Sequence, residues 1–129
     1  MAHEVVTNAD LPRPLGPYSP VVRVGDVLYL SAQAGVDPTT GAVPEGGFEA
    51  ECRQVFANIQ RALLASGSDL SHIAKTTVFY TDLQNLKTIN EVYADTFPHD
   101  PPARSAAIVG LAGGRRISID AIAIVATVA

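Results

Sequence analysis

Four polar side chains occupy apolar or proline-bounded stretches of the sequence, where a polar group can meet a small ligand. Arg104 follows two prolines at the mouth of an apolar strand pattern, and a guanidinium there can bind a carboxylate through two parallel hydrogen bonds. Asp120 is a carboxylate inside an otherwise apolar strand pattern, a setting that suits proton transfer. Ser31 lies in the middle of another strand pattern, and prolines flank Tyr18. These residue types indicate a pocket for a small carboxylate.

Each of these side chains also has a purely structural interpretation. Arg104 can belong to an ion pair, and Asp120 can pair with Arg104 or with Arg116. The hydroxyl of Ser31 can bond to the backbone, and the ring of Tyr18 can simply pack. The spacing alone leaves both interpretations open for each residue.

Other kinds of site find little support in the sequence. It contains no glycine-rich phosphate loop and no G-x-S-x-G motif. His3, His72 and His99 have no partners at ligand spacing, so we expect no metal site. Cys52 is the lone cysteine and lies on an apolar helical stripe, which predicts a core residue and excludes an internal disulfide.

Composition narrows the class of protein further. The 129 residues suit a single domain over 1–129, and 47% hydrophobic with 17% charged residues is typical of globular chains. No apolar run approaches the ~18 residues of a membrane span, and no secretory signal opens the sequence, so we expect a cytoplasmic protein. The formal net charge of −4, with Arg115-Arg116 as the one basic pair, makes nucleic acid an unlikely partner and favours small metabolites.

Two segments have the periodicity of amphipathic helices. The first runs from about Gly47 to Ser66, with one apolar stripe and with Glu51 near its start, where a carboxylate suits the helix dipole. The second starts near Asp82 or Asn85 and ends before Pro98. Each helix should bury its apolar stripe against a sheet.

Six segments have the composition of β-strands, and Gly25-Asp26 marks a hairpin turn between the second and third. They are Glu4–Val6, Val21–Val24, Val27–Ala34, Ile73–Tyr80, Ser105–Val109 and Arg116–Val125. The resulting order, β-β-β-α-β-α-β-β, predicts an α+β fold with one sheet and both helices on one face of it.

The last strand carries a signal about assembly, because both of its faces are apolar from Ala121 onward. Two helices cover only one face of the sheet, so the second face needs a cover of its own. A chain of 129 residues has no further layer to supply, and we therefore expect a homo-oligomer.

The motifs, taken in order, resemble the Rid family, the YjgF-type reactive-intermediate imine deaminases that also carry the label L-PSP endoribonuclease. The resemblance covers about Asn8 to Val125. Its motifs are Gly16-Pro17-Tyr18-Ser19, Leu30-Ser31-Ala32-Gln33, Lys75-Thr76-Thr77-Val78-Phe79, Asp82-Leu83, Asn90 with Tyr93, Pro102-Ala103-Arg104-Ser105 and Ile119-Asp120-Ala121-Ile122-Ala123.

This resemblance implies a chorismate-mutase-like fold and a homotrimer with a central barrel and three clefts between subunits. It also implies hydrolysis of reactive 2-imino or enamine acids, such as 2-aminoacrylate, to 2-keto acids and ammonia. The resemblance implies no cofactor.

Carried onto this sequence, the resemblance implies that Arg104 clamps the substrate carboxylate and that Tyr18 and Ser31 line the pocket. It places Asn90 near the cleft, and it matches Asp120 to a position where active members carry a glutamate that orients and activates water.

Two positions depart from the family pattern. Asp120 is one methylene shorter than glutamate, and Ala106 stands in the pocket wall where many deaminating members carry cysteine. These changes motivate an alternative, a trimer that binds small carboxylates without chemistry. Endoribonuclease activity is a third interpretation, which the net charge of −4 disfavours.

Overall fold

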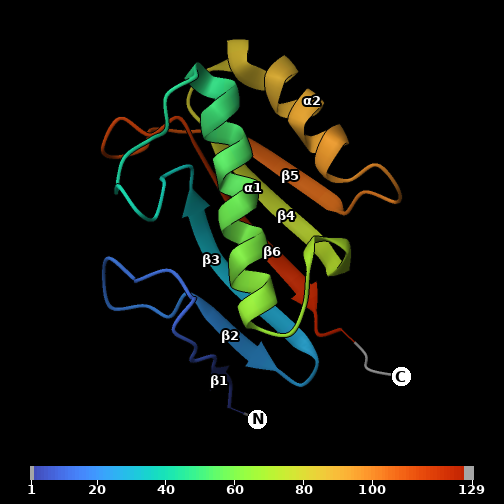
Figure 1. The fold of residues 1–129 in the computed structure, drawn as a ribbon. Coiled ribbons are helices and arrows are strands. Elements are labelled where there is room, and N and C mark those ends of the chain that lie inside the picture. Colours follow the sequence, from blue (N-terminus) through green and yellow to red (C-terminus); the bar gives the residue numbers. More distant parts are fainter. Residues whose placement is uncertain (1, 127–129) are drawn as a thin grey trace.

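The computed structural model describes residues 2–126, which form a six-stranded sheet and two α-helices (Figure 1). The elements are β1 (Glu4–Val5), β2 (Val21–Val24), β3 (Val27–Ala34), α1 (Gly47–Ala65), the 3₁₀ turn η1 (Leu70–His72), β4 (Ile73–Tyr80), the 3₁₀ turn η2 (Leu83–Asn85), α2 (Leu86–Thr96), β5 (Ala103–Ile108) and β6 (Ile117–Ile124). This order confirms the predicted α+β class. No helix of the described chain is long and apolar enough to cross a membrane.

The strands lie in the order β1-β2-β3-β6-β4-β5. Neighbouring strands are antiparallel except β4 and β5, which are parallel and are connected through α2, as a crossover requires. The predicted hairpin joins β2 to β3, with Val24 opposite Val27, and Gly25 adopts the positive φ of 57° that its turn needs.

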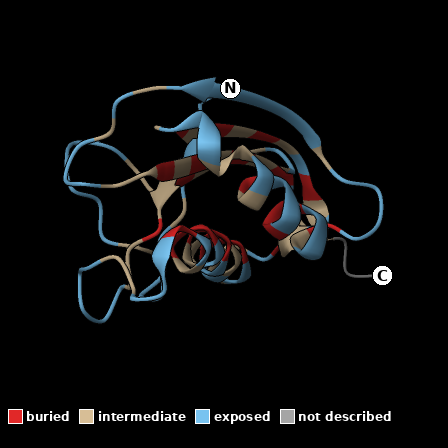
Figure 2. Cartoon of the chain, turned by 90° about the horizontal axis from the view of Figure 1, so that it is seen from above, coloured by how far each residue is buried: buried red, intermediate tan, exposed pale blue. Residues whose placement is uncertain are grey.

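Both helices lie on one face of the sheet, as predicted (Figure 2). Helix α1 packs across β3 and β6 through its buried apolar stripe. The two helices contact each other through aromatic rings. Phe56 of α1 packs edge to face against Tyr93 of α2 and against Phe97, the residue after α2, at centroid distances of 5.9 and 5.8 Å. The core therefore lies between the helices and one face of the sheet, and it includes Cys52.

The start of α2 combines the two positions expected from the sequence. The side chain of Asp82 accepts a hydrogen bond of 2.9 Å from the backbone N–H of Gln84 and so caps η2. The α-helix proper follows at Leu86 and ends at Thr96, before Pro98.

The other face of the sheet, which we call the open face, keeps apolar surface exposed. Strand β6 alternates as predicted, with Ile117, Ile119, Ala121 and Ala123 buried toward the helices. Asp120, Ile122 and Ile124 point the opposite way, and Tyr29 of β3 stands opposite Ile122. Tyr29 is 44% exposed and Ile124 is 39% exposed. This surface is what the predicted second subunit has to cover, and the oligomer remains a prediction.

Strand β5 begins at Ala103 and not at Ser105, where the prolines led us to place its start. Ala103 pairs with Lys75 and Arg104 pairs with Thr76, because the parallel ladder with β4 continues to the residue after the prolines. Arg104 is therefore part of the strand, and not a residue at its mouth.

Helix α1 passes close to the end of β3 at Gly35. A Cβ atom on Gly35 would lie 2.2 Å from the carbonyl oxygen of Glu51, so only glycine fits there. The Glu51 side chain is fully buried, and its carboxylate accepts hydrogen bonds of 2.7 Å from both the backbone N–H and the Nε–H of Arg116. Glu51 is thus a buried link between α1 and the start of β6, a role that its place near the helix start did not predict.

Candidate functional site

Arg104 lies on the helix-covered side of the sheet, next to α2. Its Cζ atom is 4.8 Å from the centroid of the Tyr93 ring, so the face of the guanidinium is held by a cation–π contact. The side chain enters no ion pair among residues 2–126. Because guanidinium N–H donors point outward in the plane of the group, its edges remain available to a carboxylate.

Tyr93 gives Arg104 a fixed platform. Its hydroxyl oxygen lies 2.8 Å from Oγ1 of Thr76, and both residues are buried. Burial raises the pKa of the Tyr93 phenol, against the opposing effects of the Thr76 hydrogen bond and the charge of Arg104. The phenol is therefore neutral around pH 7. The Tyr93 ring is held by the contact of its hydroxyl with Thr76 and by the contact of its face with Arg104.

Asp120 lies on the open face of the sheet. It is opposite Thr77 in the β4–β6 ladder, and Thr77 is opposite Ser105 in the β4–β5 ladder. Successive side chains of a strand point to opposite faces, so Ser105 and its neighbour Arg104 are on different faces. Asp120 and Arg104 consequently do not meet within one chain. Within residues 2–126, Asp120 pairs with neither Arg104 nor Arg116. The structural interpretation of Asp120, an ion pair with one of these two arginines, is therefore wrong for the single chain.

A cation that the sequence analysis did not single out lies on the same face as Asp120. Lys75 occupies the position two residues before Thr77 on β4, and its Nζ donates hydrogen bonds to Oγ of Ser105 at 3.1 Å and to the carbonyl of Thr76 at 3.2 Å. The open face thus carries a lysine, two hydroxyls and a carboxylate at neighbouring positions of the ladder. The positive charge of Lys75 makes this lysine a candidate partner of an anionic ligand.

Ser31 and Tyr18 are brought together by the proline-rich segment before β2. The Ser31 hydroxyl donates to the carbonyl of Ser19 at 2.7 Å, so its structural interpretation is confirmed. The Tyr18 hydroxyl accepts from the backbone N–H of Leu15 at 3.3 Å, and the residue is 49% exposed. Tyr18 and Ser31 line one shallow depression together with Tyr29, apart from Arg104 and Asp120.

The remaining two predicted site residues lie with Arg104. Ala106 is two positions further along β5, opposite the buried Val78, and is itself exposed. Asn90 is exposed on α2 one turn before Tyr93, which stacks on Arg104. The chain therefore presents three groups: Arg104 with Ala106 and Asn90, Tyr18 with Ser31, and Asp120 on the open face.

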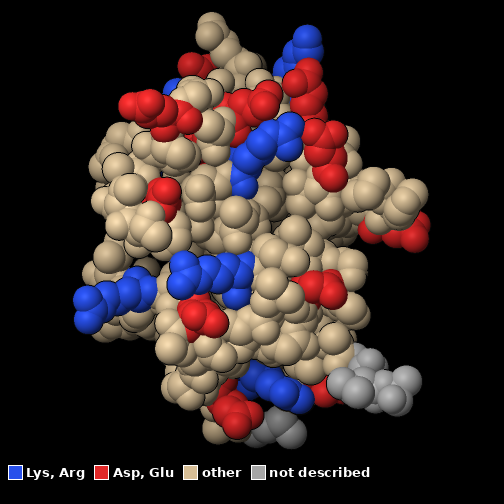
Figure 3. Space-filling model, viewed as in Figure 1, with Lys and Arg blue, Asp and Glu red and all other residues tan. Residues whose placement is uncertain are grey.

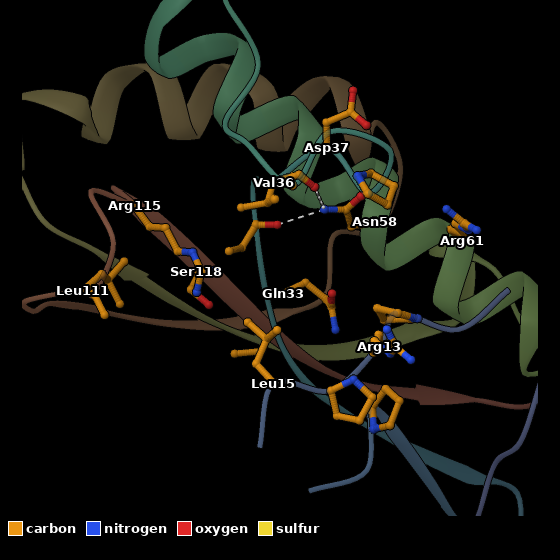
Figure 4. A pocket seen from close by; sticks show the side chains of 18 of the residues that line it. Arg13, Leu15, Gln33, Val36, Asp37, Asn58, Arg61, Leu111, Arg115 and Ser118 are labelled. Carbon is orange, nitrogen blue, oxygen red and sulfur yellow. Dashed lines mark hydrogen bonds between the residues drawn. The ribbon is translucent and has the colours of Figure 1, made fainter. Parts of the chain in front are cut away.

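A cavity of about 340 Å³ lies beside Tyr18 (Figure 4). Its walls come from four separate segments, namely residues 12–20, the end of β3 with the loop that follows it, α1, and residues 111–118. Tyr18 is the one predicted site residue in the lining. Seven other polar residues of the lining were not predicted as site residues: Arg13, Gln33, Asp37, Asn58, Arg61, Arg115 and Ser118. No single motif contains them, because they come together only through the packing of α1 and the two loops against β3.

Charged groups of both signs are mixed over the face seen in Figure 3. Lysine and arginine side chains alternate there with aspartate and glutamate, separated by wide neutral surface. Phosphate backbones are bound by continuous basic surfaces, and this face does not offer one.

The fold and these residues define a small α+β protein with an exposed arginine that lies on an aromatic ring and enters no ion pair among residues 2–126. A family model described as Endoribonuclease L-PSP matches residues 8–125. The chain belongs to this family, which is the Rid family predicted from its motifs.

Similar proteins cover nearly the whole chain. A protein of Homo sapiens named 2-iminobutanoate/2-iminopropanoate deaminase is 38% identical over 125 residues, which is 96% of this chain and 91% of the relative. The crystal structure of RidA from the Antarctic bacterium Psychrobacter sp. PAMC 21119 superposes with a TM-score of 0.87 at 35% identity, over 94% of this chain and 98% of that one. TdcF of E. coli with bound serine gives a TM-score of 0.85 at 33% identity, over 94% and 98% of the two chains. These matches confirm the predicted fold.

Proposed function

We propose that the protein hydrolyses reactive 2-imino acids to 2-keto acids and ammonia. The observation that carries the proposal is Arg104, whose guanidinium enters no ion pair within residues 2–126, lies on the Tyr93 ring and has its edges open to a carboxylate. The 38% identity to a protein named 2-iminobutanoate/2-iminopropanoate deaminase supports C=N bonds as the target. Enamine acids such as 2-aminoacrylate enter the same reaction after tautomerising to the imine.

In this mechanism water adds to the imine carbon. One water is consumed: its oxygen forms the new C–O bond, the C–N bond then breaks, and the nitrogen leaves as ammonia with the protons that the water supplied. Arg104 holds the substrate carboxylate, and Asp120 accepts a proton from water and returns it to the leaving nitrogen. Positioning contributes more than acidity, because the imine carbon is already electrophilic.

The site assembles between copies of the chain in this proposal. Arg104 and Asp120 lie on opposite faces of one sheet, so a substrate can contact both only if different subunits supply them. A homotrimer whose sheets form a central barrel would cover the apolar open face around Tyr29 and Ile124. Its clefts would bring Arg104 of one subunit to the wall that Tyr18 and Ser31 form on the next.

Sedimentation tests this assembly. Tyr29→Lys places a charge on the open face and should convert the wild-type trimer to smaller species. Leu64→Lys changes an apolar residue of α1 that is 61% exposed, against 44% for Tyr29, and should leave the trimer intact. A monomeric wild-type protein, or a Tyr29→Lys variant that sediments as the wild type does, would contradict the proposed cleft.

The partners in this proposal are a small 2-imino acid and further copies of the chain. The free thiol of Cys52, buried in the core, supports a cytoplasmic setting, because thiols are kept reduced there. The family description as an endoribonuclease raises RNA as another ligand, and the mixed charge of the face in Figure 3 does not favour it. RNA cleavage that disappears in Arg104→Ala would reverse this preference.

The activity is tested with purified protein and an enzymatic source of 2-iminobutyrate, with semicarbazide as a competing trap for the imine. Loss of two charge-assisted hydrogen bonds at Arg104 is worth about 3 kcal/mol, so Arg104→Ala should turn over roughly 100-fold more slowly. Arg104→Lys keeps the positive charge without the planar guanidinium, so its rate should lie between those of the wild type and Arg104→Ala. Arg53→Ala removes another exposed arginine, paired with Glu49 and Asp95, and should retain full activity.

The alternative of a carboxylate-binding trimer rests on Asp120 and Ala106, which replace the glutamate and cysteine common in the family. It predicts that pyruvate or 2-oxobutyrate raises the melting temperature while no imine is turned over. Deamination predicts turnover in the wild type and a lower kcat in Asp120→Asn, with the affinity for 2-oxobutyrate retained. Full deaminase activity in Arg104→Ala would contradict the carboxylate-binding role of Arg104, on which both the deaminase and the binding trimer depend.

A further inference from the structure

The cavity beside Tyr18 carries more positive charge than a monocarboxylate can use. Arg13, Arg61 and Arg115 line it, and none of the three guanidiniums enters an ion pair within the part of the chain that the structure describes. Asp37 is the one acidic residue in the lining, so two positive charges remain in excess. This concentration occurs in a chain whose formal net charge is −4.

Asp37 forms an ion pair with none of these arginines among the described residues. Its Oδ1 accepts hydrogen bonds from the backbone N–H and the hydroxyl of Thr39, at 2.8 and 2.6 Å, which lower the pKa of the carboxyl and occupy it locally. In Figure 4 the Asp37 side chain points away from Gln33, which lies in the middle of the cavity.

The cationic groups stand at two ends of the cavity. Figure 4 shows Arg115 beside Ser118 on one side and Arg13 with Arg61 on the other, with Gln33 and Leu15 between them. Prolines and Leu15 make much of the wall apolar. A volume of about 340 Å³ falls within the ~300–1,000 Å³ typical of small-molecule sites.

One wall of the cavity is held rigidly. The Nδ2 of Asn58 on α1 donates to the carbonyls of Ala34 and Val36, both at 2.9 Å, and so ties the end of β3 and its loop to the helix. The Oδ1 of Asn58 accepts from Gln54 at 2.8 Å. Both N–H groups of the Asn58 carboxamide are therefore used, and the donors left to bind an anionic ligand are the three arginines, the second N–H of the Gln33 carboxamide and the Ser118 hydroxyl.

We propose that this cavity binds the second acidic group of a dicarboxylic acid, and that the protein therefore prefers 2-imino dicarboxylates over monocarboxylates as substrates. The preference rests on the proposed function. Tyr18 lines both this cavity and the depression that contains Ser31, so the two hollows lie next to each other. The first carboxylate and imine carbon of such a substrate would occupy the cleft with Arg104, and its distal carboxylate would lie among the cavity arginines.

Calorimetric titration with two unreactive keto acids tests the binding directly. The dicarboxylate 2-oxoglutarate should bind the wild-type protein at least tenfold more tightly than the monocarboxylate 2-oxobutyrate, because its extra carboxylate gains charge-assisted hydrogen bonds. Either Arg115→Gln or Arg61→Gln should lose most of this difference, according to which end of the cavity holds the distal carboxylate, and both variants should bind 2-oxobutyrate unchanged. Arg23→Gln is the matched control, since Arg23 is an exposed arginine on the β2–β3 hairpin that pairs with Asp26.

Equal affinities for the two keto acids in the wild-type protein would overturn the inference, as would a preference that persists in both cavity variants. The semicarbazide assay separates its failure from that of the proposed function. Turnover of 2-iminobutyrate without a dicarboxylate preference defeats the inference and leaves the deaminase standing. A dicarboxylate preference that disappears in either cavity variant, without turnover of any imine, confirms the binding site and defeats the deaminase.

Discussion

The buried pair between Glu51 and Arg116 makes a quantitative prediction about stability. Arg116→Ala removes the Nε–H that donates to Oε1 of Glu51 at 2.7 Å and leaves a fully buried carboxylate with one backbone donor. Breaking a buried ion pair costs ~3–5 kcal/mol. The Arg116 side chain is 42% exposed, so water reaches part of the site, and we expect the lower end, about 3 kcal/mol.

Arg53 supplies the matched comparison, because it also pairs with carboxylates but does so on the surface. Its side chain is 47% exposed, and its partners Glu49 and Asp95 are 58% and 64% exposed. Surface pairs of this kind contribute ~1 kcal/mol or less. Arg53→Ala should therefore cost at most about a third of what Arg116→Ala costs.

Urea unfolding at one fixed protein concentration measures both variants. With a slope of ~2 kcal/mol per M, Arg116→Ala should lower the midpoint by about 1.5 M. Adding Glu51→Gln to Arg116→Ala should restore part of the loss, because the second change removes the buried charge that the first one strands. Equal shifts for Arg116→Ala and Arg53→Ala, or no recovery in the double variant, would refute the reasoning.

Three further outcomes follow from the core. Burial raises the pKa of the Cys52 thiol from 9.0 to about 12. The free energy of unfolding should therefore fall as the pH rises from 9 toward 12, because the thiol ionises in the unfolded chain and stays neutral in the folded one. Cys52→Ala should flatten this fall in urea unfolding measured over that pH range. Tyr93→Phe should cost about 1–3 kcal/mol in urea unfolding, since it leaves the buried Oγ1 of Thr76 without its 2.8 Å partner; a neutral result would mean that water replaces the phenol. Gly35→Ala should destabilise more than Gly110→Ala, since Gly110 has open space around it and no left-handed backbone conformation, and equal melting temperatures would argue against the close approach of Glu51.

Periodicity was sufficient to predict the elements of this fold. The stripe of α1 and the alternation in β6 each depend on residues close in sequence, so their spacing carried the information. The hairpin at Gly25 likewise follows from local turn chemistry. Strand β5 was the exception, because its first residues are ordered by the ladder with β4 and not by their own composition.

The site was less accessible to this reasoning, because its geometry is set by contacts between distant segments. Arg104 was found from its proline-bounded position, but its stacking on Tyr93 depends on how α2 lies over β5. The burial of Glu51 could not be predicted from the sequence, because it depends on the close approach of α1 to β3 at Gly35. The arginines of the cavity come from different segments and share no motif.

The most direct test of the account is the initial rate at which the purified wild-type protein removes 2-iminobutyrate in the presence of semicarbazide. We predict a fall in the semicarbazone formed from the imine that is proportional to protein concentration, with an equal gain in free 2-oxobutyrate; ammonia is released on both routes and should not change. An unchanged yield of the trapped imine, from folded protein that still binds 2-oxobutyrate, would contradict it.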